Sequence, residues 1–374
     1  MIIKIDKDAL LEGLQKVFNI VPQKPTLPML SNYLLSVQSG RIFISGTDMD
    51  ISITTSVACN VVEEGSSTVN AKKFLGIIRE LPSEEISISV ENDKITVDYS
   101  KGKTSIIGMT SADYPSLKDN LEGNEISFSS DDFVEMADKT SFSAAKDRTR
   151  LVLTGIYWKI SLDEMVMVST DGHRLSLFGR KIDVDTTNKP AESEIIIPPA
   201  TLNTASQIIA GGENIDKIVF GEKAVLFKIG ETVIYSKLLE GPYPNFRQVI
   251  PQNNSKKVIV SVTELEAAVR RVSVISSSIT HMIKMRISSG LMEISTINED
   301  IGGESRESIA VRYDGDTMIA GYNGQFLSEI LKRIDTEDVL IEMESPTTAC
   351  LLKPVGLKDS DEYIYLIMPL RLSD

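Results

Sequence analysis

The sequence repeats one pattern three times, and this repetition limits the folds that the chain can adopt. An apolar strand followed by an amphipathic helix is predicted at residues 2–5 and 8–18, at 126–128 and 131–139, and at 258–260 and 263–274. A polar turn within an alternating strand pattern also recurs, in the segments that start at Phe43, Met167 and Leu291, and both intervals are 124 residues (167 − 43 and 291 − 167). A repeat of this length predicts three similar units, each the size of a domain.

Each repeat also contains a second predicted helix, over residues 70–81, 199–209 and 323–334. Asn70 and Asn323 stand at the start of two of these helices and are candidate N-caps. Strict alternation on either side of Asn92 and Asp93 predicts an antiparallel hairpin with one solvated face. The fold class is therefore α+β, with three similar domains that each contain two helices and antiparallel sheets. Polar joints near residues 120–125 and 252–256 place these domains at 1–124, 125–252 and 253–374.

The composition, with 42% hydrophobic and 25% charged residues, is that of an ordinary globular protein. Cys59 and Cys350 are the only cysteines, which is too few for a disulfide framework or a zinc ligand set and fits a reducing compartment. Charge interrupts the amino terminus too early for a signal peptide, and no apolar run approaches a membrane span. We therefore expect a cytoplasmic protein without a membrane partner. The sequence has no phosphate loop or metal spacing, so no cofactor and no metal are expected.

Basic residues gather on the predicted helices although the net charge is −14. Such a charge argues on average against a nucleic-acid partner, because phosphate binding depends on Lys and Arg, but a local field can differ from the average. One interpretation is that these are solvated helix faces; their recurrence in all three repeats favours a shared role. The residues are Lys72, Lys73 and Arg79, then Lys139 with Lys146 and Arg148 just beyond its helix, then Arg270, Arg271, Lys332 and Arg333.

Two functions without a role on DNA, an enzyme and a scaffold, are also compatible with these residues. Asp171 and His173 lie close together and could serve an enzyme, although the same residues could simply cap or end a strand. The chain could also be a scaffold of repeated domains with no role on DNA. Replacing His173 by Ala would remove an enzyme's turnover, whereas neutralising the helix bases would leave a scaffold unchanged.

Several motifs resemble those of the bacterial DNA polymerase III beta subunit, the sliding clamp family. Thr170 to Leu175 read TDGHRL, Gly241 to Arg247 read GPYPNFR, and Tyr365 to Leu372 read YLIMPLRL. The first repeat adds PTLPML from Pro25, SGTD from Ser45 and DYP from Asp113. The resemblance covers the whole chain, because its motifs come from all three repeats in order.

The resemblance implies the DNA clamp fold, closed by two chains joined head to tail into a ring that encircles double-stranded DNA without sequence specificity. It implies a non-enzymatic processivity factor whose partners are replicative DNA polymerase subunits, an ATP-dependent clamp loader, and other polymerases and repair proteins that share a clamp-binding peptide. The basic helix faces would then meet phosphate, and Lys24 matches a further basic position facing DNA. The homodimer interface would include Ile106, Val274 and Ile275, which could equally be core residues.

The resemblance also implies a groove for partner peptides between the second and third domains, with apolar walls and arginines at the rim. The matching positions are Arg150, Leu153, Thr170, Gly172, His173, Arg174, Leu175, Pro244, Val249, Leu366, Met368, Pro369, Leu370 and Arg371. The alternative for residues 368–372 is a strand that merely closes the core. Gln248 stands where arginine is common in the family, Leu370 where methionine is common, and Ser373 and Asp374 extend the usual end. These departures leave the preference for peptides open.

Overall fold

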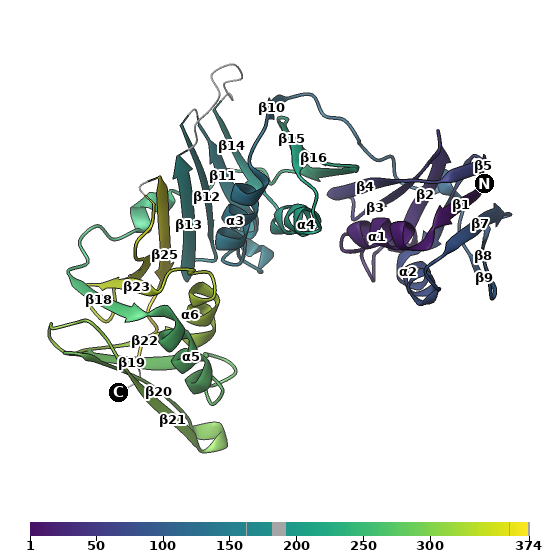
Figure 1. Cartoon of the computed structure of the whole chain (residues 1–374). Helices are drawn as coiled ribbons and strands as arrows, with labels where there is room; N and C mark the ends of the chain where they lie inside the picture. Colours follow the sequence, from purple (N-terminus) through teal and green to yellow (C-terminus); the bar gives the residue numbers. More distant parts are fainter. Residues whose placement is uncertain (162, 182–191, 359, 373–374) are drawn as a thin grey trace. The chain divides into compact units, whose positions relative to one another are not determined.

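The computed structural model describes residues 1–161, 163–181, 192–358 and 360–372. Every strand pairing found in these ranges is antiparallel, and each predicted repeat contributes two α-helices, so the α+β class is confirmed. The helices are α1 (Lys7–Phe18), α2 (Ala71–Glu80), α3 (Ser130–Ser141), α4 (Pro199–Ala210), α5 (Val262–Ser273) and α6 (Gly324–Leu331) (Figure 1).

The chain divides into two compact units, and the middle repeat contributes to both. The first unit contains Met1–Val134 and Ala200–Leu239, and the second contains Glu135–Pro199 and Glu240–Asp374. The three domain boundaries at residues 124 and 252 therefore stay a prediction from the repeat.

Two antiparallel sheets form the first unit. The five-stranded sheet has the order β5-β1-β7-β8-β9, with β5 (Asn60–Glu63), β1 (Ile2–Asp6), β7 (Glu85–Glu91), β8 (Lys94–Tyr99) and β9 (Gly102–Ile107). The eight-stranded sheet has the order β10-β15-β16-β17-β4-β3-β2-β6, with β10 (Asn124–Ile126), β15 (Ile215–Phe220), β16 (Ala224–Ile229), β17 (Thr232–Lys237), β4 (Ile51–Ala58), β3 (Arg41–Thr47), β2 (Asn32–Gln38) and β6 (Gly65–Asn70). The β17–β4 pair joins the first repeat to the second.

Helical periodicity explains how α1 and α2 pack. Leu10, Leu14 and Val17 are fully buried on one face of α1, which contacts α2, β3 and β4. Asn70 caps α2 as predicted, since its side chain accepts a hydrogen bond from the Lys73 N–H at 3.1 Å. The apolar face of each helix therefore covers a sheet, while its polar face stays in solvent.

The second unit repeats this plan. Its eight-stranded sheet has the order β14-β11-β12-β13-β25-β24-β23-β18, with β14 (Ser193–Ile197), β11 (Ile156–Ile160), β12 (Glu164–Thr170), β13 (Arg174–Lys181), β25 (Asp361–Ile367), β24 (Cys350–Pro354), β23 (Asp338–Met343) and β18 (Lys256–Ser261). The four-stranded sheet has the order β21-β20-β19-β22, with β21 (Gly303–Ala310), β20 (Leu291–Asn298), β19 (Met282–Ser288) and β22 (Met318–Asn323). The β13–β25 pair joins the second repeat to the third, with Arg174 opposite Ile367 and Arg180 opposite Asp361.

A bidentate ion pair holds one end of this joint. Arg180 donates from Nε and Nη2 to the two carboxylate oxygens of Asp361 at 3.0 and 2.7 Å. The Arg180 guanidinium holds the pKa of Asp361 below its ordinary value, against the opposing effect of burial. The pair therefore stabilises the folded state only while Asp361 is ionised.

We expect Asp361→Asn to destabilise the protein near neutral pH, and the difference from wild type to shrink in acid. The unfolded chain binds a proton at about the ordinary value of 3.8, so the contribution is complete above that pH and is lost as the pH falls through the lower pKa of the folded state. Urea unfolding between about pH 7 and about pH 3 measures this difference, with Asp300→Asn as an exposed control. A difference that stays constant over this range would contradict the prediction.

Three predictions of local structure differ from the structure. The third polar segment, which begins at Leu291, runs along β20 and contains no turn, so the recurring turn exists only in the first two repeats. The predicted strand at 126–128 ends at Ile126, because the chain turns at Ser129 to begin α3, where Phe133 N–H donates to the Ser129 carbonyl. Helix α6 ends at Leu331 rather than at residue 334, while Asn323 caps it as predicted.

Candidate functional site

A tight turn between β12 and β13 explains the Thr-Asp-Gly motif. The Thr170 hydroxyl donates to the Arg174 carbonyl at 2.6 Å and accepts from the Gly172 N–H at 3.1 Å. Asp171 Oδ1 accepts from the N–H groups of His173 and Arg174, each at 2.9 Å. Gly172 has a φ of 89°, which favours glycine. The motif therefore forms a turn, and Oδ1 of the Asp171 carboxylate accepts the backbone hydrogen bonds that stabilise it.

Arg174 was expected at the rim of the groove, but its side chain is buried and holds the second repeat against the third. Its Nη2 donates to the Phe142 carbonyl at 2.8 Å, and Nε donates to Asp171 Oδ2 at 3.1 Å. Its Nη1 binds the carboxylate of Glu329 on α6, and the guanidinium lies 4.3 Å from the centroid of the Phe326 ring. Arg174 still lines the cavity described next.

A cavity of about 790 Å³ in the second unit gathers ten of the fourteen predicted groove residues, and we call it the β13–β25 groove. These ten are Arg150, Leu153, Thr170, Gly172, Arg174, Leu175, Pro244, Val249, Leu366 and Met368. They come from the 3-10 segment Arg148–Thr154, from the turn before β13 and the start of β13, from the end of β25, and from the segment that joins the second repeat to the third. Leucine, valine, proline and methionine side chains dominate this set, so the groove has an apolar character.

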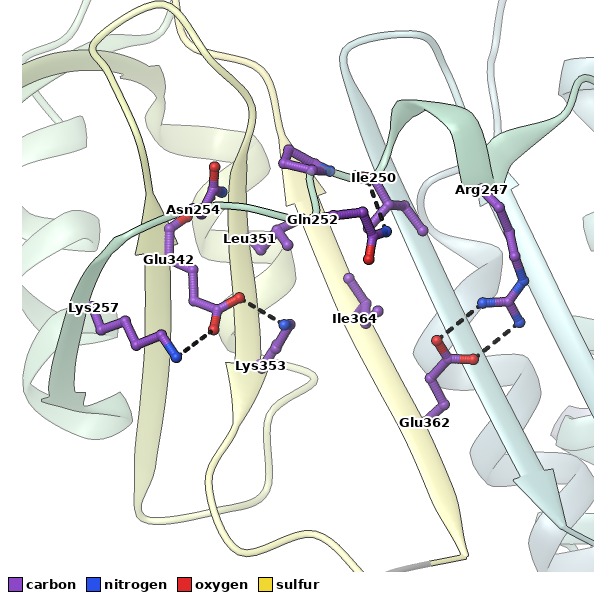
Figure 2. Close-up of a pocket in the computed structure, with 11 residues that line it drawn as sticks. Arg247, Ile250, Gln252, Asn254, Lys257, Glu342, Leu351, Lys353, Glu362 and Ile364 are labelled. Carbon is purple, nitrogen blue, oxygen red and sulfur yellow. Dashed lines mark hydrogen bonds and ion pairs between the residues drawn. The ribbon is translucent and has the colours of Figure 1, made fainter.

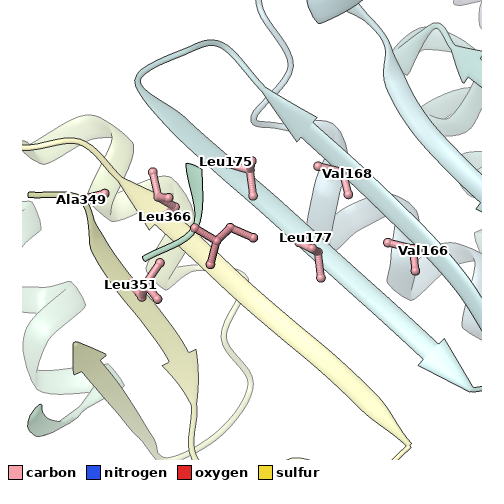
Figure 3. Close-up of a cluster of buried hydrophobic side chains, with 8 residues drawn as sticks. Val166, Val168, Leu175, Leu177, Ala349, Leu351 and Leu366 are labelled. Carbon is pink, nitrogen blue, oxygen red and sulfur yellow. The ribbon is translucent and has the colours of Figure 1, made fainter. Parts of the chain in front are cut away.

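A cluster of buried side chains forms the floor of the β13–β25 groove (Figure 3). The cluster spans β12, β13, β24 and β25 and consists of Val166, Val168, Leu175, Leu177, Ile250, Ala349, Leu351 and Leu366. Leu175, Ile250, Ala349 and Leu366 are shared between this cluster and the groove lining. Above the floor, Val249 and Met368 are 57% and 40% exposed, so apolar surface is accessible to a ligand.

Four predicted groove residues do not line the β13–β25 groove. His173 is exposed, and its carbonyl accepts a hydrogen bond from the Met368 N–H at 2.8 Å. Leu370 donates its N–H to the Gly321 carbonyl on β22, also at 2.8 Å, while Pro369 is half-buried and Arg371 is exposed. Residues 368–370 therefore leave β25 and attach to the other sheet of the unit.

The sequence interpretation missed most of the lining that follows Pro244. Phe246, Ile250 and Pro251 line the β13–β25 groove, as does the loop that contains Thr347 and Ala349. Asn245 and Phe246 lie within the quoted GPYPNFR motif, and Gln248 was named as a departure from the family, so these three positions carried a signal. The loop before β24 carries no such motif, and only the folded sheet brings it near.

A second, more polar cavity of about 360 Å³ shares Ile250, Pro251, Gln252 and Asn254 with the groove lining (Figure 2). Its charged residues are paired with one another. Arg247 donates to both carboxylate oxygens of Glu362 at 3.1 Å, and Lys353 donates to Glu342 at 2.6 Å. Lys257 lies 3.8 Å from the same Glu342 carboxylate. Ion pairs within the protein therefore account for the charged side chains of this cavity.

The predicted DNA-facing residues fall into two groups. Lys24, Lys72, Lys73, Arg79, Lys146, Arg148, Arg270 and Lys332 are exposed. Among them, Lys146 and Lys332 line one cavity of about 400 Å³ together with Arg333. Arg271 is exposed but bonded to Glu307, with an Nε–Oε2 distance of 2.9 Å, and Arg333 lies 3.0 Å from the Asp138 carboxylate.

Lys139 is a correction to the predicted DNA-facing set. Its side chain is buried, with the residue only 4% exposed, and its Nζ binds the Arg333 carbonyl and the Asp335 carboxylate. The ammonium also lies 5.6 Å from the centroid of the Tyr363 ring. Lys139 therefore packs the α3 end against the segment after α6 and offers no free charge to phosphate.

The predicted interface residues lie beside two sheet edges. Ile106 is half-buried on β9, an edge strand of the five-stranded sheet, and its neighbour Ile107 is 80% exposed. Val274 follows α5 and is 77% exposed. Ile275 is half-buried and lies against Gly303, the first residue of the edge strand β21.

The described residues contain no group of three or more His, Cys, Asp or Glu side chains that could hold a metal ion. None of the helices in the described ranges is long and apolar enough to cross a membrane.

Comparison with known proteins identifies the class to which this fold and site belong. Family models of the DNA polymerase III beta subunit match three consecutive segments: the N-terminal domain model matches residues 1–118, the central domain model residues 127–245, and the C-terminal domain model residues 247–371. The chain therefore belongs to the DNA polymerase III beta subunit family, the bacterial sliding clamps. The three-domain α+β architecture is that of the clamp fold.

Individual relatives agree over the full length. The chain is 28% identical over 370 residues to the beta sliding clamp of Pseudomonas putida, covering 98% of this chain and 99% of the relative, and has the same values for the clamp of Escherichia coli K12. Its structure is similar to the crystal structure of the DNA polymerase III beta subunit from Pseudomonas aeruginosa, with a TM-score of 0.88, 27% identity and full coverage of both chains. A sliding clamp from Bartonella birtlesii bound to griselimycin gives a TM-score of 0.90 at 26% identity, also with full coverage.

Proposed function

We propose that two copies of this chain close into a ring around duplex DNA and that the β13–β25 groove tethers DNA polymerases to it. The observation that carries this proposal is the groove itself, which gathers ten residues from distant parts of the sequence over an apolar floor. Membership of the sliding clamp family supplies the context of replication. The chain acts as a processivity factor and not as an enzyme.

The groove suits short peptide segments. Accessible Val249 and Met368 stand over the buried Leu175 and Leu366, so a peptide can place two or three apolar side chains against protein. Each buried side chain contributes about 1.5–3 kcal/mol, and ordering costs offset part of this sum, which leaves a Kd of roughly micromolar. Such an affinity lets the replicative polymerase, the clamp loader, and other polymerases and repair proteins exchange on one site.

The exposed bases of the helices are the proposed DNA contacts. Contacts to phosphate carry no base information, so binding is independent of sequence. A weak nonspecific Kd, on the order of 10⁻⁴ M or weaker at cellular salt, suits a ring that topology retains and that must slide. Burial removes Lys139 from the proposed contact set.

Ring closure uses the edge strands β9 and β21 of two different copies. An edge strand presents unpaired backbone N–H and C=O groups and favours pairing with another strand. The exposed Ile107 is the last residue of β9, and Ile275 lies against the start of β21. An ATP-dependent loader is then needed to open the ring.

A peptide titration tests the tethering function. A fluorescent peptide from the clamp-binding segment of the host's replicative polymerase is titrated against the full chain by polarisation, and roughly micromolar binding is expected. A folded protein that fails to bind this peptide would overturn the proposal. Deleting residues 368–374 is a poor control, because it also removes the backbone hydrogen bonds to His173 and Gly321.

Neutralising four exposed bases is expected to weaken the affinity for DNA. The change is Lys72, Lys73, Arg270 and Lys332 to Gln, because these side chains are exposed. The slope of log K against log salt concentration should fall in magnitude by up to about 0.9 per lost phosphate contact. The measurement is equilibrium binding of the chain to a short linear duplex, which topology does not hold, at several salt concentrations.

The matched control neutralises four exposed lysines on strands and hairpins, namely Lys4, Lys94, Lys101 and Lys284. It has the same net charge as the test variant. Equal losses in the two variants would show that overall charge, and not the helix faces, governs the affinity for DNA.

A further inference from the structure

The turn between β3 and β4, at the joint between the first and second repeats, has the same hydrogen bonds as the turn between β12 and β13 that lines the β13–β25 groove. The Thr47 hydroxyl donates to the Ile51 carbonyl at 2.8 Å and accepts from the Met49 N–H at 3.0 Å. Asp48 Oδ1 accepts from the N–H groups of Asp50 and Ile51 at 3.0 and 2.8 Å. Thr170 and Asp171 make the same four bonds, 123 positions later (170 − 47).

The strand that pairs with the strand after this turn is also equivalent in the two units. In the first unit, β4 pairs with β17 so that Ser52 lies opposite Tyr235. In the second unit, β13 pairs with β25 so that Leu175 lies opposite Leu366. Tyr235 and Lys237 therefore occupy the positions that Leu366 and Met368 occupy in the groove.

The segments that lead from one repeat to the next match as well. Tyr114 precedes Pro115 as Tyr243 precedes Pro244. Burial raises the pKa of both tyrosines. The two joints thus share their turn, their strand pairing and their linker.

The equivalent positions in the first unit line a cavity of about 220 Å³, less than a third of the groove volume of about 790 Å³. We call it the β4–β17 cavity. Seven groove residues have counterparts there: Thr47, Met49, Ile51, Ser52, Pro115, Tyr235 and Lys237. Among the substitutions, Lys237 replaces a methionine and Ile51 replaces Arg174, and Lys118 also lines this cavity.

Met49 is the most informative of these substitutions. It has a φ of 83°, where the equivalent Gly172 has 89°, and a non-glycine residue is strained in this region. Its side chain is 47% exposed at the cavity. An exposed methionine adapts to different ligand shapes, and strained residues cluster at binding sites.

The geometry points to a second peptide site in the β4–β17 cavity, which takes an extended partner segment with one or two apolar residues flanked by carboxylates. The apolar residue would contact Tyr235, Leu117 and Met49. The carboxylates would meet Lys118, whose Nζ lies 5.4 Å from the centroid of the Tyr235 ring, and Lys237, which lies 3.1 Å from exposed Asp50. This inference rests on the proposal that the β13–β25 groove binds peptides.

Methionine-methyl NMR tests both sites in one sample. Met49 reports the β4–β17 cavity and Met368 the β13–β25 groove, and Met49→Leu and Met368→Leu assign the two signals among the thirteen methionines. The probe is an acetylated hexapeptide with adjacent leucine and phenylalanine between aspartates. We expect it to shift the Met49 signal in a saturable way, and the polymerase peptide to shift the Met368 signal.

Charge reversal tests the affinity of the acidic probe quantitatively. Lys118→Glu with Lys237→Glu should weaken the acidic probe at least tenfold, because both lysines are exposed and meet its carboxylates. Lys4→Glu with Lys101→Glu carries the same charge change elsewhere and should have little effect. Met49→Gly should relieve the backbone strain and leave folding intact. It should also weaken the binding of the acidic probe.

The outcomes separate the two proposals. A shift of Met368 by the polymerase peptide, with no shift of Met49 by the acidic probe, would overturn the second site and leave the tethering function standing. A shift of Met368 alone by the acidic probe would also overturn the second site, because the probe then occupies the groove. If neither probe shifts either methionine, both proposals fail.

Discussion

Replacing Val249 and Met368 together by Asp is expected to weaken binding of the polymerase peptide about 100-fold or more. Both side chains are accessible apolar surface over the floor of the β13–β25 groove. Losing two anchors of about 1.5 kcal/mol each, at about 1.4 kcal/mol per tenfold change, predicts a factor of this size. Polarisation with the labelled peptide measures the Kd, and primer extension measures the loss of processive synthesis.

The control for this experiment changes two exposed apolar residues outside the groove. Leu27 and Val62 are 54% and 64% exposed in the first unit, so Leu27→Asp with Val62→Asp introduces the same charges without touching the site. Thermal unfolding should show that both variants fold. A groove variant that binds the peptide as tightly as wild type would mean that the peptide lies elsewhere.

Arg174→Ala is expected to destabilise the second unit by about 3–5 kcal/mol, the range for breaking a buried ion pair from one side. The substitution leaves the Glu329 carboxylate without its cation and the Phe142 carbonyl without the Nη2 donor, and it removes the stacking on Phe326. Because Arg174 also supports the groove, peptide binding should weaken too. Urea unfolding measures the loss.

Two further variants identify the cause. Arg174→Lys keeps the charge but loses the planar fork and the stacking, so it should recover only part of the stability. Adding Glu329→Ala to Arg174→Ala removes the uncompensated carboxylate, so the double variant should be less unstable than the two single changes predict together. Additive losses would show that the Arg174–Glu329 pair contributes nothing of its own.

Local patterns carried the fold prediction. The apolar positions Leu10, Leu14 and Val17 recur at helical spacing, and all three are buried. Asn70 and Asn323 are N-caps as predicted, since a cap depends only on a residue and its next three neighbours. The third polar turn was wrong because alternation alone does not show whether a strand continues, and β20 continues through it.

The candidate site was reached by resemblance rather than by pattern. Thr170, Leu366 and Met368 belong to motifs that resemble the family, and the structure brings them to one cavity. Ala349 and Thr347 belong to no such motif and were missed. They reach the cavity only through the pairing of β24 with β25, which sequence spacing does not reveal.

The sequence by itself determined the threefold repeat, the two helices of each repeat and the α+β class, because periodicity and caps act over a few neighbouring residues. Only the tertiary structure decided which bases stay free and which arginine is buried. Lys139 and Arg174 read as surface cations, yet each is buried and forms an ion pair with a residue of the third repeat, Asp335 in one case and Glu329 in the other. Both ion pairs join the second repeat to the third, as the β13–β25 pair does, so the environment of each charge depends on contacts between residues far apart in the sequence.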